Sequence, residues 1–185
     1  MARRTPRRRA QPESAVAPAL LWAPWRSAYV TRAQQHAGEC IFCFGRLSAV
    51  TRRRRLVLYA GPLALVMLNR YPYNNGHLMV APRRHVASPE LLTRDELIAL
   101  AEIVARSVQR LREVYRPAGL NVGLNLGRAA GAGFVDHMHW HLVPRWEGDN
   151  NFMPVIASTR VLPQSLTETQ ALLEPLFKAI DTALS

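Results

Sequence analysis

The chain has 185 residues, 49% of them hydrophobic, and a formal net charge of +11 at pH 7. This length and hydrophobic content are enough for one globular domain with its own core. The charge is mostly local, because five arginines lie within residues 3–9 and four more form the run 52–55. A nucleic-acid surface more often spreads its cations over a folded face and interleaves aromatic residues. The composition therefore argues against nucleic acid as the main partner and favours a solvated N-terminal arm, with contact between that arm and RNA, DNA or an acidic partner as the lesser alternative.

Residues 1–19 are rich in Arg, Pro and Ala, and we predict a disordered tail there, followed by a single domain over residues 20–185. The tail lacks the apolar segment of a secretory signal, although an organellar transit peptide has a similar Arg-rich composition. No run of about 18 apolar residues follows, so no membrane-spanning segment is predicted. Cys40 and Cys43 are too few for a disulfide framework, which favours a reducing, cytoplasmic setting.

Apolar segments separated by turn residues predict five strands. These are residues 55–61, 63–69, 76–82, 120–126 and 135–143. Strands in hairpin-like succession, interrupted by one long helix, are typical of an α+β domain. We therefore predict an antiparallel five-stranded sheet with one long helix and a C-terminal helix.

The long helix is predicted between the third and fourth strands. Thr93 and Glu96 form a capping-box signal at its start, and Pro117 and Gly119 end it. Its apolar positions repeat with a helical period. They are Leu97, Leu100, Ala101, Val104, Val108 and Leu111. By the same capping signal, Thr167 and Gln170 predict the start of the C-terminal helix.

Three histidines, His137, His139 and His141, alternate with apolar residues in the segment DHMHWHLV. In a strand this spacing puts all three on one face. At about 3.3 Å per residue the outer two are roughly 13 Å apart, too far for one tetrahedral ion to bind all three rings. At least two roles must be divided among them. Because neutral imidazole is a nucleophile at neutral pH, the segment indicates a catalytic site rather than a half-buried strand with hydrogen-bonded histidines.

The segment HMHWHLV has a His-x-His-x-His pattern with apolar x, and it resembles the histidine triad (HIT) superfamily of nucleotide hydrolases and transferases. The stretches MLNRYPYNNGHLMVAPRRH and NLGRAAGAGFVDH resemble that family's nucleotide-binding strands and phosphate-binding loop. The resemblance covers about residues 20–156 and implies a HIT-like fold. The segments LWAPWR, CIFC and HLVPRWEGDNNFMPV are most similar to the ATP adenylyltransferase branch, which phosphorolyses diadenosine tetraphosphate (Ap4A).

The resemblance implies that His139 attacks the α-phosphorus of a nucleoside polyphosphate and forms a covalent nucleotidyl-histidine, which divides one difficult displacement into two. His141 would donate a hydrogen bond to the phosphate oxygens, and His137 would orient the nucleophile or bind a metal. In the predicted reaction Ap4A and inorganic phosphate give ATP and ADP. The alternative is a hydrolase of dinucleoside polyphosphates or nucleoside phosphoramidates, with water as the acceptor. A protein that binds adenine nucleotides without turnover is a further alternative, against which the intact His139 argues.

Other residues match positions that contact the nucleotide in the family. Gly131 and Gly133 have no side chains, so their backbone N–H groups can close on a phosphate. The resemblance implies that Asn125 contacts phosphate and that Asn69 lies near the ribose hydroxyls, although asparagine is also a common turn residue. Trp146 resembles a residue that closes the nucleotide site. His77 lies in the nucleotide-binding strand pair, where a purely structural role is an equal alternative.

Cys40 and Cys43 form a C-x-x-C pair, which by itself fits a redox pair, half of a metal site or coincidence. Zinc-bearing relatives join a similar pair to a histidine of a P-x-x-H segment and to the first triad histidine. The resemblance thus implies His85 and His137 as partners, and two thiolates with two imidazoles form a closed set suited to structural zinc. His36 lies four residues before Cys40 and is an alternative ligand.

The resemblance also implies a homodimer, built through the long helix and an edge strand. Its small-molecule partners would be an adenine nucleotide or dinucleoside polyphosphate, together with inorganic phosphate. Whether a divalent cation accompanies the substrate, and which base is preferred, are questions that the sequence leaves open.

Overall fold

The computed structural model describes residues 40–45, 47–149 and 164–183. The predicted tail over residues 1–19, the remainder of the domain before residue 40, and His36 lie outside these ranges. The elements are α2 (Ala49–Arg54), β1 (Val57–Ala60), β2 (Ala64–Leu68), β3 (Leu78–Pro82), the 3-10 helix η1 (Pro89–Leu91), α3 (Arg94–Tyr115), β4 (Gly119–Leu124), β5 (Trp140–Arg145) and α5 (Leu166–Ala183). Within the described ranges, no helix combines the length and the apolar composition needed to cross a bilayer.

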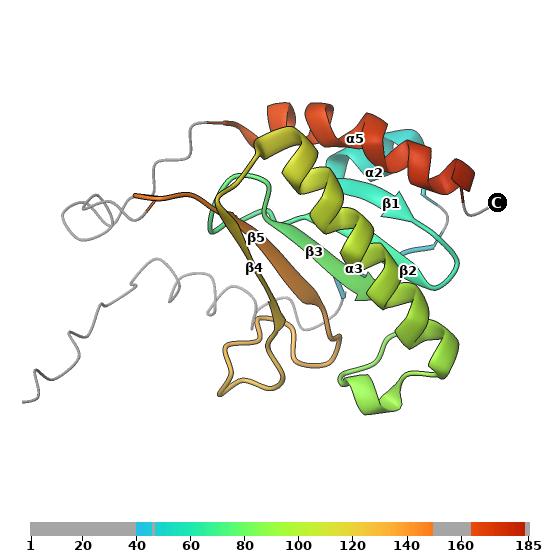
Figure 1. The fold of residues 1–185 in the computed structure, drawn as a ribbon. Helices are drawn as coiled ribbons and strands as arrows, with labels where there is room; N and C mark the ends of the chain where they lie inside the picture. The colour runs from blue at the N-terminus through green and yellow to red at the C-terminus, as the bar shows by residue number, and fades with distance from the viewer. Residues whose placement is uncertain (1–39, 46, 150–163, 184–185) are drawn as a thin grey trace, which may run out of the picture.

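The strands form one antiparallel sheet in the order β1-β2-β3-β5-β4. This confirms the predicted α+β class and the five-stranded antiparallel sheet with one long and one C-terminal helix. Strand β5 is inserted between β3 and β4, so the end of the histidine segment lies inside the sheet and β4 lies at an edge (Figure 1).

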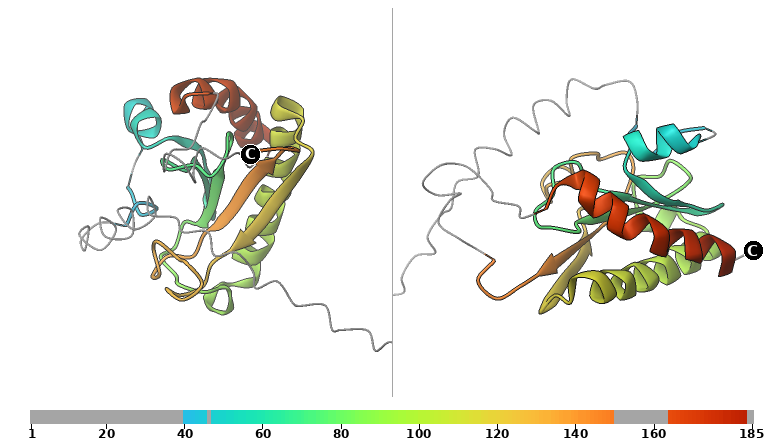
Figure 2. Two further views of the ribbon diagram at one scale, coloured as in Figure 1. Left: turned by 90° about the vertical axis from the view of Figure 1, so that its left-hand side faces the viewer. Right: turned by 90° about the horizontal axis from the view of Figure 1, so that it is seen from above.

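Alternate side chains of the strands enter two separate cores, because successive residues of a strand point to opposite faces. On β2, Val66 and Leu68 belong to the larger apolar cluster, whereas Leu65 and Met67 belong to the smaller one. Helices α3 and α5 cover the larger cluster on the same side of the sheet (Figures 1 and 2). Phe42, from the segment before α2, packs in the smaller cluster. The two faces of the sheet are thus covered by different parts of the chain.

Helix α3 begins with the predicted capping box. The Thr93 hydroxyl accepts from the Glu96 N–H, and the Glu96 carboxylate accepts from the Thr93 N–H. Leu100 is buried as predicted, but Leu97 is 46% exposed and Ile103 is buried instead. The buried residues of α3 are Glu96, Leu100, Ile103, Ser107 and Leu111, and the helix contacts β3 and β5. Leu97 lies outside this buried set.

The predicted start of the fifth strand is wrong. The prediction began the strand at residue 135, but β5 begins at Trp140. The physical reason is a competing contact, since the Met138 N–H donates to the Val86 carbonyl at 2.7 Å. The segment before Trp140 therefore follows the loop after β3 instead of continuing the ladder.

Two helix starts also differ from the prediction. Ser165 and Glu168 form the capping pair of α5, with hydrogen bonds in both directions, in place of the predicted pair Thr167 and Gln170, which lies two residues later. Helix α2 was not predicted, because its sequence reads as a run of charge. The Ser48 hydroxyl accepts from the Thr51 N–H and caps it.

Candidate active site and metal cluster

The three triad histidines have different surroundings. His141 lies on β5 opposite Met79 of β3, which puts it on the face of the smaller cluster. His137 and His139 precede the strand and are almost fully buried, with exposed fractions of 1% and 4%. The ring centroids of His139 and His141 are 4.8 Å apart and the rings meet edge to face. The predicted division of roles is therefore matched by a division of environments.

His139 is held in one tautomer by the main chain. Its Nδ1 lies 3.0 Å from the His137 carbonyl oxygen. A carbonyl only accepts, so Nδ1 carries the proton and Nε2 keeps its lone pair. Burial lowers the pKa of His139 despite this hydrogen bond, and the Phe42 ring packs 4.8 Å away. The ring is therefore neutral at pH 7, with Nε2 unprotonated.

His141 is oriented by a second histidine. The Tyr73 N–H donates to His77 Nδ1 at 3.1 Å, so the proton of His77 is on Nε2. His77 Nε2 lies 3.0 Å from His141 Nδ1 and donates to it. In neutral His141 the proton must then be on Nε2. His77 is fully buried, which favours a role through His141 over direct contact with a nucleotide.

Cys40, Cys43, His85 and His137 converge on one point, although they come from three separate segments. Their ligand atoms all lie within 4.8 Å of one another. Cys40 Sγ and Cys43 Sγ lie 3.2 and 3.5 Å from His137 Nδ1, and Cys43 Sγ lies 3.2 Å from His85 Nδ1. The two Nδ1 atoms are themselves 3.2 Å apart. These four residues could hold a metal ion.

The tautomer of His137 fits metal binding. Its Nε2 lies 3.0 Å from the Pro82 carbonyl and donates to it, which leaves the Nδ1 lone pair facing the cysteines. Burial, followed by the nearby His85 and His139 rings, lowers the pKa of His137 to about 4, so the ring is neutral. Burial and the adjacent Cys40 thiol raise the pKa of Cys43 to about 11 in the metal-free protein. A metal ion would displace the thiol protons.

In the Gly-rich loop, the two predicted phosphate donors, the N–H groups of Gly131 and Gly133, differ in their hydrogen bonding. Gly131 has a φ of +88°, which favours glycine. Its N–H donates to the Arg128 carbonyl at 2.9 Å, so this donor is used within the loop. Asn125 Nδ2 approaches the Gly131 carbonyl at 3.5 Å. Among the residues that the structure describes, the Gly133 N–H has no acceptor, so Gly133 is the better candidate for a phosphate donor.

Asn69 and Trp146 are held by contacts of different kinds. The Asn69 N–H donates to the His77 carbonyl at 2.9 Å. Asn69 Oδ1 accepts from the Tyr71 N–H at 2.9 Å and forms a turn at the end of β2. The Trp146 ring packs edge to face against Tyr115, with centroids 6.3 Å apart. Trp146 and His139 flank opposite ends of β5. The closure of the nucleotide site by Trp146 stays a prediction.

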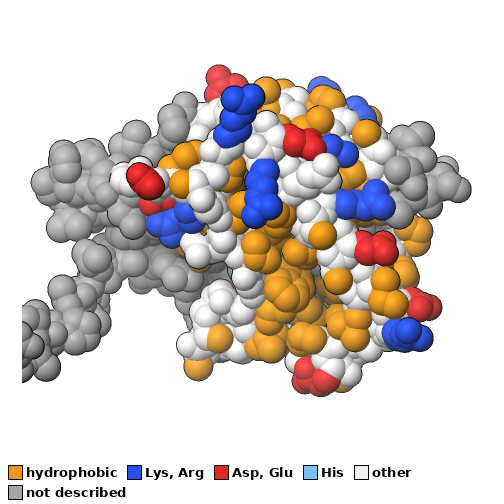
Figure 3. Space-filling model, in the orientation of Figure 1, with side chains coloured by type: hydrophobic (Ala, Val, Ile, Leu, Met, Phe, Trp, Pro, Cys, Tyr) orange, Lys and Arg blue, Asp and Glu red, His pale blue; other side chains and the backbone are white. Residues whose placement is uncertain are grey.

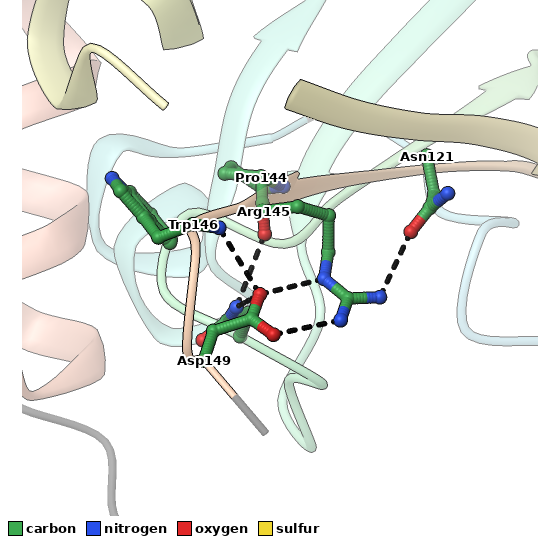
Figure 4. A network of polar contacts seen from close by, with 6 residues as sticks. Asn121, Pro144, Arg145, Trp146 and Asp149 are labelled. Carbon is green, nitrogen blue, oxygen red and sulfur yellow. Dashed lines mark hydrogen bonds and ion pairs between the residues drawn. The ribbon is translucent and has the colours of Figure 1, made fainter. Parts of the chain in front are cut away.

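Sequence reasoning missed a polar network at the far end of β5. Arg145 and Asp149 pair with each other, and Asp149 also accepts from Asn74 (Figure 4). The only signal in the sequence is the spacing of four between Arg145 and Asp149, which by itself is common in surface pairs. Phe42 was also missed, because it reads as the filler of the C-x-x-C pair.

Comparisons with known proteins agree with this geometry. A family model described as HIT domain matches residues 51–148, more than half of the chain. AP-4-A phosphorylase from Mycobacterium tuberculosis is 40% identical over 158 residues, which cover 83% of this chain and 81% of that protein. A hypothetical histidine triad nucleotide-binding protein from Sulfolobus tokodaii has a TM-score of 0.56 at 26% identity, covering 78% of this chain and 93% of that one. A Zn-bound histidine triad family protein from Mycobacterium smegmatis has a TM-score of 0.55 at 23% identity, covering 84% and 96%.

An antiparallel sheet with two helices on one face and alternating histidines toward the other defines an enzyme of the histidine triad class. The matching family model and the extent of the M. tuberculosis relative make the assignment specific. The chain belongs to the HIT family, as its triad segment predicted.

Proposed function

We propose that the protein is a nucleotidyl transferase that cleaves Ap4A with inorganic phosphate. His139 Nε2 attacks the α-phosphorus, forming a P–N bond and breaking the P–O bond to the remainder of the substrate, which leaves as ATP. Phosphate then attacks the adenylyl-histidine, breaks the P–N bond and leaves as ADP. The name of the M. tuberculosis relative, 40% identical over most of both chains, supports this reaction.

The observation that carries the proposal is the tautomer of His139. A nucleophilic imidazole must be neutral and must present a lone pair to phosphorus. The bond from Nδ1 to the His137 carbonyl meets that requirement without any other side chain. A buried ring with a lowered pKa also stays neutral below pH 7.

His141 complements the nucleophile in the proposed reaction. Because His77 donates to its Nδ1, the His141 Nε2–H is the donor that can meet charge developing on the phosphate oxygens. The Gly133 N–H is a second proposed donor, and Asn125 and Gly131 shape the loop that carries it. Asn69 and His77 are proposed to support the nucleotide through the loop between β2 and β3.

Water is the alternative acceptor. Bis(5'-nucleosyl)-tetraphosphatase (asymmetrical) from Schizosaccharomyces pombe is 33% identical over 93 residues, half of each chain. In this alternative we propose the same attack by His139, with water in place of phosphate as the group that attacks the nucleotidyl-histidine.

The acceptor is tested by quantifying the products of Ap4A with and without inorganic phosphate. Phosphorolysis predicts equal amounts of ATP and ADP and little turnover when phosphate is omitted. Release of AMP at the same rate without phosphate would exclude phosphorolysis in favour of hydrolysis. Acid-labile labelling of His139 by radiolabelled substrate after rapid quenching tests the shared first step.

We also propose that Cys40, Cys43, His85 and His137 bind a structural zinc ion. The two sulfur and two nitrogen donors converge, and the Pro82 carbonyl holds the His137 lone pair toward the others. A bound zinc would cross-link the segment before α2 to the loop after β3 and to the triad. Because the site needs reduced thiols, a cytoplasmic setting suits it.

Two copies are proposed to associate through β4 and α3. Strand β4 lies at the sheet edge and none of its residues is buried. Val122 on β4 and Ile98 on α3 are 42% and 46% exposed, and hydrophobic side chains gather on the side that these elements share (Figure 3). An edge strand beside an apolar patch favours a two-fold pairing of identical chains.

A further inference from the structure

The turn after β5 contains a carboxylate with four hydrogen bonds (Figure 4). Asp149 accepts from Arg145 Nε and Nη2 at 2.6 and 2.7 Å and from the Trp146 N–H at 3.1 Å. Its fourth donor is Asn74 Nδ2 at 2.9 Å. The Asp149 side chain is only 9% exposed. A carboxylate so fully used by the protein has little capacity left for a ligand, which indicates that it holds neighbouring segments in place.

Asn74 connects this carboxylate to the loop between β2 and β3. Its Nδ2 donates to both Asp149 and the Pro144 carbonyl, so both amide protons are used. The main-chain carbonyl of Asn74 accepts from the His77 N–H at 3.2 Å. The loop also passes Gly76, at a φ of +73°, where a Cβ would lie 2.7 Å from the Tyr115 ring. The loop is thus fixed at Asn74 from the β5 side.

The residue next to Asn74 sets the proton on His77. Tyr73 donates its backbone N–H to His77 Nδ1, and its ring stacks on the His77 ring with centroids 4.9 Å apart. A displacement of Asn74 would also move the Tyr73 Cα, because the peptide unit between Tyr73 and Asn74 is rigid, and the Tyr73 N–H is attached to that Cα. It would move the His77 main chain as well, since the His77 N–H donates to the Asn74 carbonyl. His77 could then adopt the tautomer with its proton on Nδ1 and stop donating to His141.

We propose that Asn74 and Asp149 are positioning residues for His141. They act through the Tyr73 N–H and His77, and they keep the proton of neutral His141 on Nε2, where it serves as the phosphate donor. The inference depends on the proposed function only for this last role, since the tautomer itself is a property of the free protein.

Two variants test the proposal from both ends of the contact. Asp149→Asn removes the charge that holds Arg145 and Asn74. Asn74→Ser replaces the amide with a shorter hydroxyl, which cannot donate to both Asp149 and the Pro144 carbonyl, and leaves the Arg145–Asp149 pair intact. For both we expect kcat with Ap4A to fall about 10- to 100-fold with KM changed less than about threefold, as for other small displacements of a reacting group. The matched control is Glu113→Gln, which breaks the 2.7 Å pair with Arg110 on α3.

The decisive readout is the tautomer of His141, measured by ¹⁵N NMR and assigned by the signal that His141→Gln lacks. We expect an Nε2–H tautomer in the wild type and the Glu113→Gln variant, and a mixture in the other two. Folded variants that keep the wild-type tautomer would overturn the proposal, whether or not their activity falls. If the tautomer shifts but the wild type does not turn over Ap4A, the positioning role stands and the proposed function fails.

Discussion

At the residue scale, two histidines of the triad receive their proton arrangement from groups other than the triad side chains. A main-chain carbonyl decides it for His139, and a chain from the Tyr73 N–H through His77 decides it for His141. The consequence is opposite polarity on adjacent rings, with a lone pair on one Nε2 and a proton on the other. This pairing suits attack on a phosphorus whose oxygens gain charge.

Replacing the proposed nucleophile separates chemistry from binding. In His139→Asn the amide can still donate to the His137 carbonyl, but it has no nucleophilic nitrogen. We expect turnover of Ap4A to fall at least about 10⁴-fold, as when other covalent nucleophiles are removed. Nucleotide affinity, measured by calorimetry, should change less than about threefold. Substantial residual turnover with a normal burst would contradict the assignment.

Cys40→Ser tests the metal cluster at the residue scale. The wild type is expected to hold about one zinc per chain by elemental analysis, and the variant far less. Loss of the cross-link should destabilise the fold by about 3 kcal/mol and lower Tm by roughly 6–12 °C, because binding energy at a structural site is folding energy. Turnover at low temperature should fall much less than stability. A metal-free wild-type protein that is fully folded and has the same Tm as the zinc-bound protein would refute the zinc proposal.

At the element scale, the start of α3 depends on one buried carboxylate. Glu96 closes the capping box with Thr93 and pairs with Arg84 at 2.7 Å. The Arg84 hydrogen bond, followed by the Thr93 N–H, lowers the pKa of Glu96 from 4.5 to about 2. A carboxyl with a lowered pKa stabilises the fold above its unfolded pKa, and this contribution is lost as pH falls toward the folded value.

Glu96→Gln should therefore lower stability in a pH-dependent way. We expect a loss of about 1–2 kcal/mol at pH 7, reduced from the full linkage value because solvent screens the half-exposed Arg84. The difference from wild type should be constant above about pH 5 and should shrink toward pH 2. Urea unfolding across this range measures it. Glu113→Gln on the exposed part of the same helix is the control, and an equal loss there would contradict the argument.

At the scale of the whole molecule, the strand order decides which surfaces remain for a partner. Because β5 is inserted between β3 and β4, the edge strand β4 is unpaired on one side within the described chain. The Val122 side chain shares a face with Leu142, its partner in the ladder, and therefore lies beside α3. One helix and one strand thus form the surface through which we propose that a second copy binds.

Light scattering of Val122→Asp tests this interface. A buried charge at a two-fold interface occurs twice, so we expect a dimer in the wild type to become a monomer at micromolar concentration. The control is Leu172→Asp on α5, where a leucine of similar exposure, 48%, is replaced away from β4. A monomeric wild type, or a variant that remains dimeric, would contradict the proposal.

Local sequence predicted the elements well where one signal dominated. Thr93 and Glu96 marked the start of α3 because a capping box uses residues three apart. The prediction failed at residues 135–139, where strand periodicity was intact but the Met138 N–H pairs with Val86, far away in sequence. It also failed at Leu97, whose exposure depends on how the helix lies across the sheet.

The sequence by itself determined the fold class, because the strands and helices follow from the periodicity of apolar residues and from turn and capping residues. Its resemblance to the HIT superfamily, carried by short motifs, indicated the family, the triad and the four candidate metal ligands. Only the tertiary structure decided which nitrogen of each histidine carries its proton and that Asn74 and Asp149 meet. Those properties depend on contacts such as His77 with His141 and Asn74 with Asp149, whose partners are distant in the chain and come within hydrogen-bonding distance only when the sheet has formed.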